Sequence, residues 1–170
     1  MPELPDITVY TAALRPRILG RALTKITVRG PSLLRTFDPP LESAEGRAVT
    51  NISRLGKRII LELAADDEPL FLVLHLMIAG RLLWKPADAK VTGKIDQAGF
   101  WFDPPAPDGG LLVLTEASPK KRASLHLLRG RAALRELDPG GADPLAINAA
   151  DLAALLRPAN NVGNRTIKRA

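Results

Sequence analysis

The stretch Ser53-Arg54-Leu55-Gly56-Lys57-Arg58-Ile59-Ile60 decides the fold, because it places a turn glycine between two β-like runs. These runs extend from Arg47 to Ser53 and from Arg58 to Leu63. Glycine adopts the backbone conformations of tight turns at little steric cost. The stretch therefore predicts a hairpin of two antiparallel strands, with Lys57 beside its turn.

Further β-like runs extend this pattern in both directions along the chain. They are Leu23 to Val28, Leu70 to Leu76, Gly80 to Trp84, Gly99 to Phe102, Leu111 to Thr115 and Ala123 to Leu128. Most of the separating segments are rich in turn residues, and no helical pattern lies between the runs. Such a series favours an antiparallel sandwich or barrel over βαβ units.

Helical patterns are expected only at the two ends of the chain. Ile7, Tyr10 and Leu14 recur at helical spacing, which predicts a helix from about Pro5 to Arg15 that Pro16 and Gly20 limit. The predicted fold class is thus mainly β with flanking helices (α+β): an antiparallel β-sandwich with an N-terminal helix.

The composition changes after Leu128, where we place a domain boundary. A short helical stretch leads to a Pro/Gly-rich linker over 137–145. Asn148 is the expected N-cap of a helix that has Asp151 at its third position and runs to about Arg157. The predicted organisation is a sandwich domain over 1–130, a linker over 131–147 and the start of a helical domain over 148–170, with another helix near Asn164.

Composition limits the class of protein and of partner. The 170 residues, 46% of them hydrophobic, suffice for one good core, and 24 Lys and Arg against 18 Asp and Glu give a net charge of +6. This charge favours a polyanion such as nucleic acid. The absence of cysteine excludes disulfides and cysteine-bound zinc within these residues. No leader pattern or apolar run of about 20 residues is present, so we expect a cytoplasmic protein.

The first residues carry groups that suit covalent catalysis. If Met1 is removed, Pro2 becomes a terminal secondary amine, and an α-amino group titrates near pKa ~8, so part of it is a free nucleophile at neutral pH. Its attack on a sugar aldehyde carbon gives an iminium ion, and the carboxyl group of Glu3 lies next in the chain as a general acid or base. The alternative is that Pro2 and Pro5 only stiffen the approach to a helix whose positive end Glu3 and Asp6 stabilise.

The opening Met1-Pro2-Glu3-Leu4-Pro5-Asp6 resembles that of the formamidopyrimidine-DNA glycosylase and endonuclease VIII family of base-excision repair enzymes. The resemblance implies a β-sandwich flanked by helices, with Pro2 as the Schiff-base nucleophile and Glu3 as the proton donor. It further implies that Lys57 is the hairpin lysine that contacts phosphate near the lesion and assists catalysis. Without the resemblance, Lys57 reads as an ordinary solvated turn residue.

Two other segments resemble DNA-contacting loops of the same family. Leu74-His75-Leu76-Met77-Ile78-Ala79-Gly80 is similar to His-Leu-Gly-Met-Ser-Gly, whose methionine enters the duplex. Counted from His75, Ile78 takes that place, with Met77 beside it. The alternative is that Met77 and Ile78 are core residues at a strand end. His75 is expected to contact phosphate or to be a strand histidine, and His126 to be a satisfied strand histidine.

The segment from Thr115 to Ser124 resembles the loop Asp-Pro-Arg-Arg-Phe-Gly. Lys120 and Lys121 fall where the arginines stand, and Arg122 falls where the phenylalanine stands. The resemblance therefore implies phosphate binding by this loop more than insertion of a side chain between bases. Lys168, in the start of the helical domain, is a further expected phosphate contact. A solvated charged turn is the alternative for the loop.

The chain also departs from the family pattern. Lys94-Ile95-Asp96-Gln97 lacks both histidines of the Lys-His-Asp-His segment found in many members. The zinc finger with its catalytic arginine should lie beyond Ala170, so we expect no metal or cofactor in this chain.

Together these features predict a monomeric bacterial DNA glycosylase with abasic-site (AP) lyase activity on damaged double-stranded DNA, with no membrane partner. One alternative is a truncated, non-catalytic DNA-binding module of the same fold. The other is a structural or interaction domain whose positive charge is incidental, and it would show no salt-dependent affinity for DNA.

Overall fold

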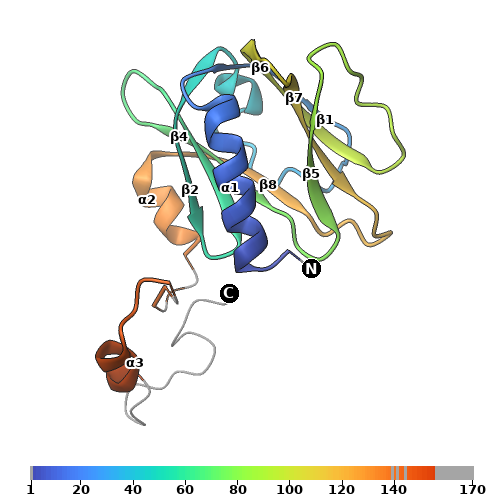
Figure 1. The fold of residues 1–170 in the computed structure, drawn as a ribbon. Helices are drawn as coiled ribbons and strands as arrows, with labels where there is room; N and C mark the ends of the chain where they lie inside the picture. The colour runs from blue at the N-terminus through green and yellow to red at the C-terminus, as the bar shows by residue number, and fades with distance from the viewer. Residues whose placement is uncertain (1, 139, 141, 144, 156–170) are drawn as a thin grey trace.

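The computed structural model describes residues 2–138, 140, 142–143 and 145–155 (Figure 1). In chain order the elements are α1 (Leu4–Ile18), β1 (Ala22–Val28), the 3₁₀ helix η1 (Leu41–Ala44), β2 (Arg47–Leu55), β3 (Arg58–Leu63), β4 (Leu70–His75), β5 (Gly80–Lys85), β6 (Asp96–Ala106), β7 (Gly109–Glu116), β8 (Ser124–Arg129), α2 (Gly130–Glu136) and α3 (Ala149–Leu155). Each predicted strand is present, and β2 and β6 extend beyond the predicted ends.

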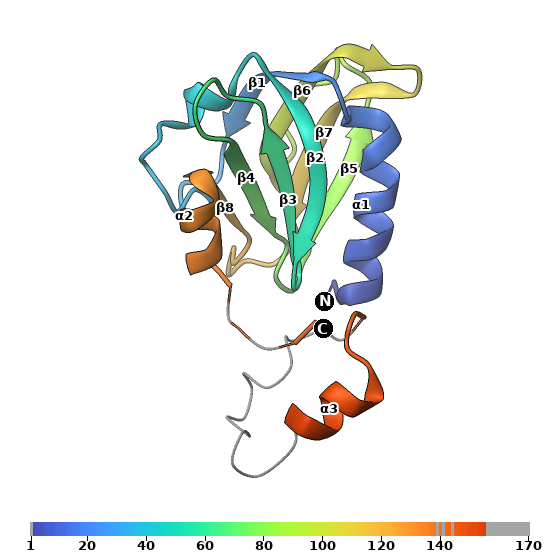
Figure 2. The ribbon, with the colours of Figure 1, turned by 90° about the vertical axis from the view of Figure 1, so that its left-hand side faces the viewer.

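The strands form one antiparallel series that is folded into two layers. Their order is β5-β7-β6-β1-β2-β3-β4-β8. β1 pairs with β2 only at Ala22↔Ala48 and Leu23↔Arg47, whereas it pairs with β6 along its whole length. The series bends at this short junction, so that β5-β7-β6-β1 faces β2-β3-β4-β8, with α1 along one side (Figure 2). The predicted antiparallel sandwich is confirmed.

The main core lies between the two layers, and a smaller one lies outside them. Fully buried side chains from both layers and from α1 fill the main core, among them Ile7, Ile18, Leu61, Leu72, Phe100 and Leu112. A second cluster of Ile60, Phe71, Val73 and Leu128 packs against Ala133, Leu134 and Leu137 at and after α2. β4 is therefore covered on both faces, which explains its unbroken apolar run.

The predicted end of the first helix is wrong. α1 continues through Pro16 to Ile18. Proline lacks the N–H that would bond to the carbonyl one turn earlier, which costs helix stability. Ile18 is completely buried in the main core. Burial of a side chain of this size contributes about 1.5–3 kcal/mol, comparable to the cost of proline within a helix, so tertiary packing carries the helix past Pro16.

The predicted start of the last described helix is confirmed. The backbone N–H of Asp151 donates to Oδ1 of Asn148 at 2.9 Å, which is the N-cap contact expected from the sequence. Arg157 and the predicted helix near Asn164 lie outside the described residues. No helix in the described ranges is long and apolar enough to cross a membrane.

Candidate active site

Strand register gathers the candidate residues at one end of the sandwich. Arg58 pairs with His75, and His75 pairs with Ser124. Gly80 pairs with Glu116 in the other layer. The β2–β3 turn, the β4–β5 loop and the β7–β8 loop therefore meet at the same end, where α1 also begins (Figure 2).

The β2–β3 hairpin presents Lys57 at this end. Leu55 pairs with Arg58, so only Gly56 and Lys57 form the turn. Gly56 has φ = +56°, a left-handed value that favours glycine, and glycine at the first of two turn positions is typical of a type II′ hairpin. The predicted hairpin is thus confirmed. The Lys57 side chain is only 18% exposed, so it is not the freely solvated lysine of the alternative interpretation.

The first residues of the chain meet this lysine directly. Glu3 precedes α1, and its backbone N–H donates to Oδ2 of Asp6 at 2.7 Å, which fixes the start of the helix. The carboxylate of Glu3 lies 2.5 Å from Nζ of Lys57. Pro2, the adjacent residue, is buried at the same place. The structure therefore brings the three predicted catalytic residues to one end of the sandwich, and their roles stay predictions.

His75 ends β4 beside these cations. Its pKa is lowered from the ordinary 6.5 to about 4, first by partial burial and then by the charges of Arg58, Lys57 and His126. Repulsion among like charges and loss of hydration both disfavour the imidazolium form. His75 is consequently a neutral imidazole at physiological pH, able to offer a hydrogen bond but no charge to a phosphate.

This lowered pKa predicts a stability change in mild acid. Between pH 6.5 and about 4 the unfolded chain protonates His75 and the folded chain does not, so the free energy of unfolding should fall as pH falls through this window. Denaturant titrations at pH 7 and pH 4.5 should show a smaller loss for His75→Gln than for the wild type. An equal loss in both proteins would contradict the assignment.

The β4–β5 loop displays an apolar residue at this end. Met77 has φ = +52°, in the left-handed region, at the place where the similar segment His-Leu-Gly-Met-Ser-Gly has glycine. Gly80 closes the loop, and a Cβ there would lie 2.3 Å from the backbone oxygen of Leu76. Ile78 is 49% exposed, so it is not the core residue of the alternative interpretation. Met77 is half-buried.

The β7–β8 loop is held by a buried carboxylate that sequence reasoning missed. Glu116 is 1% exposed and accepts the backbone N–H groups of Arg122 at 2.8 Å and Ala123 at 3.1 Å. A buried charge is tolerated only when such donors satisfy it. The ammonium of Lys121 donates to the backbone oxygen of Glu116, and Lys121 has φ = +41°. Lys121 therefore folds back onto its own loop, while Lys120 and Arg122 are exposed.

The other residues singled out in the sequence lie within strands or outside the described residues. His126 is a strand histidine of β8 as expected, but its Nδ1 is buried with no hydrogen-bond partner among the described residues, so it is not satisfied at that atom. Asp96 and Gln97 are both buried at the start of β6, where Asp96 accepts the N–H of Gly93 at 2.8 Å. Lys168 lies outside the described residues.

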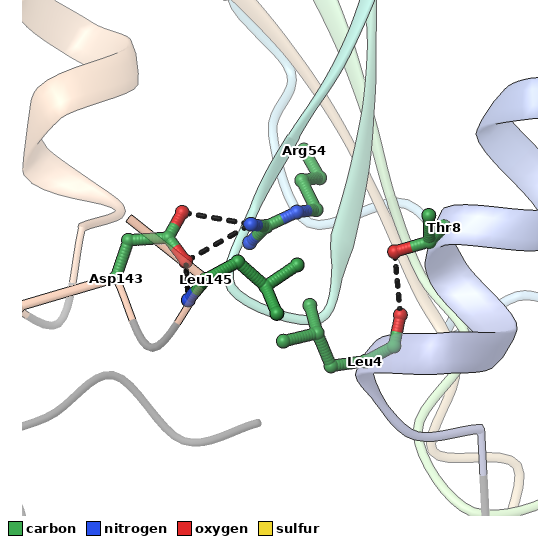
Figure 3. A network of polar contacts seen from close by, with 5 residues as sticks. All are labelled: Leu4, Thr8, Arg54, Asp143 and Leu145. Atoms are coloured by element: carbon green, nitrogen blue, oxygen red, sulfur yellow. Dashed lines mark hydrogen bonds and ion pairs between the residues drawn. The ribbon is translucent and has the colours of Figure 1, made fainter. Parts of the chain in front are cut away.

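Two arginines near the β2–β3 turn contact the linker, which sequence reasoning also missed. Arg54 forms an ion pair with Asp143 at 2.8 Å (Figure 3). Arg58 donates to the backbone oxygen of Leu137 at 3.1 Å. The only signal in the sequence was the presence of arginines on both sides of the turn.

Comparison with known proteins shows the same fold and sequence pattern. The family model described as "Formamidopyrimidine-DNA glycosylase N-terminal domain" matches residues 1–130. The formamidopyrimidine-DNA glycosylase of Heliobacterium modesticaldum is 30% identical over 151 residues, which cover 85% of this chain and 51% of that protein. The enzyme of the same name from Cupriavidus pinatubonensis is 34% identical over 124 residues, which cover 71% and 43%.

Solved structures match as well. The crystal structure of a Lactococcus lactis Fpg mutant in complex with Fapy-dG containing DNA superposes with a TM-score of 0.70 at 25% identity, covering 84% of this chain and 50% of that one. A complex of Lactococcus lactis Fpg with DNA containing an abasic site gives a TM-score of 0.73 at 23% identity, a likeness of fold. The chain spans about half the length of the curated relatives it matches.

Proposed function

Because this chain belongs to the formamidopyrimidine-DNA glycosylase family, we propose that it excises damaged bases from double-stranded DNA and cleaves the resulting abasic site as a lyase. The observation that carries the proposal is the 2.5 Å contact between Glu3 and Lys57 next to Pro2. An acid and a cation therefore lie next to the residue that would become a terminal amine.

In the proposed reaction, the nitrogen of Pro2 attacks C1′ of the damaged nucleotide, and the bond from C1′ to the base breaks. Glu3 protonates the ring oxygen as the sugar opens, which leaves an iminium ion between Pro2 and C1′. Loss of a C2′ proton then expels the 3′ phosphate by β-elimination. Water finally hydrolyses the bond between C1′ and the Pro2 nitrogen, which regenerates the free amine. Met1 must be absent, since the amide nitrogen of a Met1-Pro2 bond is not a nucleophile.

The exposed groups at the same end suit a damaged duplex. Lys120 and Arg122 project from the β7–β8 loop and can approach phosphates, and Lys168 remains a proposed phosphate contact. Ile78, half exposed at the β4–β5 loop, offers an apolar wedge for the space left by a flipped nucleotide. Extrusion of the base would bring C1′ to the amine of Pro2.

The experiment that tests this function uses two duplexes with the 170-residue chain. One contains a preformed abasic site and the other 8-oxoguanine. We expect β-elimination at the abasic site to exceed excision of the oxidised base, because a preformed site needs no base recognition. Strand cleavage that persists in Glu3→Gln at the wild-type rate, or no cleavage of either duplex, would contradict the proposal.

A non-catalytic DNA-binding module is the second candidate. It is favoured by the exposed cations Lys120 and Arg122 of the β7–β8 loop. Such a module would bind duplex DNA with strong salt dependence and leave abasic sites intact.

Either function predicts unequal roles for the neighbouring lysines of the β7–β8 loop. Each phosphate contact contributes about −0.9 to the slope of log affinity against log salt. Lys120→Ala should make the slope shallower by about that amount, whereas Lys121→Ala should change it less, because Lys121 is already bound to Glu116. Fluorescence anisotropy across a salt series measures both slopes. A larger change for Lys121→Ala would show that its contact with Glu116 does not persist on DNA.

A further inference from the structure

The hairpin that carries Lys57 is attached to the linker on both of its strands. On β2, Nη2 of Arg54 donates to both carboxylate oxygens of Asp143, at 2.9 Å and 2.8 Å. On β3, Nη1 of Arg58 donates to the backbone oxygen of Leu137 at 3.1 Å. We call these two interactions the linker contact. They join segments that are 89 and 79 residues apart in the chain, on either side of the turn that holds Lys57.

The linker contact is partly shielded from water. The side chains of Arg54 and Asp143 are 19% and 34% exposed, so their ion pair is less screened than a fully solvated pair. Desolvation lowers the pKa of Arg58, and the charge of Asp138 opposes this effect. Both arginines are thus held in surroundings where losing the linker's oxygen acceptors would cost stability.

The acceptor side of the contact is itself ordered. Oδ1 of Asp143 also accepts the backbone N–H of Leu145 at 3.0 Å, which fixes the carboxylate within its own turn. Figure 3 shows the side chain of Leu145 directed toward Leu4. Leu4 is the first residue of α1 and directly follows Glu3, so the same stretch of linker binds the hairpin at Arg54 and faces the residue next to Glu3.

We propose that Arg54 and Asp143 are positioning residues that hold the hairpin so that Lys57 meets Glu3, an inference that rests on the proposed function. Arg54 lies three residues before Lys57, and only Leu55 and Gly56 separate the two. A displacement of the linker would therefore move Lys57 relative to Glu3 and Pro2. The linker contact couples the chain beyond the sandwich to the proposed reaction.

A direct role of Arg54 in phosphate binding makes a different prediction for Asp143. If Arg54 only bound DNA, removing the carboxylate of Asp143 would free the guanidinium and would leave affinity unchanged or higher. As a positioning pair, Arg54→Ala and Asp143→Ala should slow the reaction alike, because a displacement of about 1 Å can cost up to about 10²-fold in rate.

The experiment measures single-turnover cleavage of an abasic-site duplex at saturating protein, together with the dissociation constant of the same duplex. Hydrogen exchange of the backbone amides of residues 54–58 is measured without DNA. Each single variant should slow cleavage by about 10-fold and speed exchange, and the double variant should be no slower than either one. Arg17→Ala and Asp108→Ala remove a more exposed ion pair, with side chains 32% and 49% exposed, at the opposite end of α1. They should leave the cleavage rate and the exchange of residues 54–58 unchanged.

Wild-type cleavage and exchange in Asp143→Ala would overturn the inference, and so would additive effects in the double variant. Hydrogen exchange also separates this inference from the proposed function. If the wild type cleaves nothing, the proposed function fails, while faster exchange in both single variants still upholds the linker contact and unchanged exchange overturns it.

Discussion

Replacing Lys57 by methionine should slow β-elimination at an abasic site by about 10²-fold or more at saturating DNA, the range expected for loss of a positioned acid-base or charged group. Methionine keeps much of the length of the side chain and removes its charge. The Lys57 ammonium lies 2.5 Å from Glu3 and is mostly shielded from solvent, so its charge acts at the proposed reacting centre. Single-turnover cleavage measures the effect.

Lys120→Ala is the matched control for this variant. It removes one exposed lysine at the same end of the sandwich without touching Glu3. We expect it to weaken binding and to leave the saturated rate nearly unchanged. Lys57→Met should show the reverse, with a larger effect on rate than on affinity. A wild-type rate for Lys57→Met at saturation would exclude Lys57 from the reaction.

The strands and the hairpin were predictable because their signals are local. A turn glycine between β-like runs, as at Gly56, specifies a hairpin whatever packs around it. The asparagine cap of α3 is equally local, with Asn148 and Asp151 three residues apart. The end of α1 was mispredicted because the burial of Ile18 is a tertiary effect that no local pattern reports.

The candidate site was only partly predictable for a related reason. Pro2, Glu3 and Lys57 were predicted from the resemblance of the chain's opening and of its hairpin to a known family, and the fold brings Glu3 and Lys57 into contact. Lys120 and Lys121 look alike in sequence, but in the folded loop Lys121 has a left-handed backbone and donates to the backbone oxygen of Glu116, whereas Lys120 is exposed. Arg54 and Asp143 are 89 residues apart, and nothing in either segment specifies the other.

In the proposed mechanism, the terminal amine of Pro2 forms the covalent bond to DNA. An iminium ion between protein and sugar is reduced by borohydride to a stable amine, so trapping converts the proposed intermediate into a product that survives denaturation. The preparation must first be shown by mass spectrometry to lack Met1. Pro2→Gly keeps a terminal amine but changes its basicity and geometry, and an N-terminal extension blocks it entirely.

The most direct measurement is therefore borohydride trapping on a duplex with one abasic site, followed by mass spectrometry of the cross-linked peptide. We predict a covalent complex whose adduct lies on Pro2, weakened or absent in Pro2→Gly and absent when the N-terminus is extended. Equal trapping by the extended protein, or an adduct on a lysine in place of Pro2, would contradict the proposed mechanism.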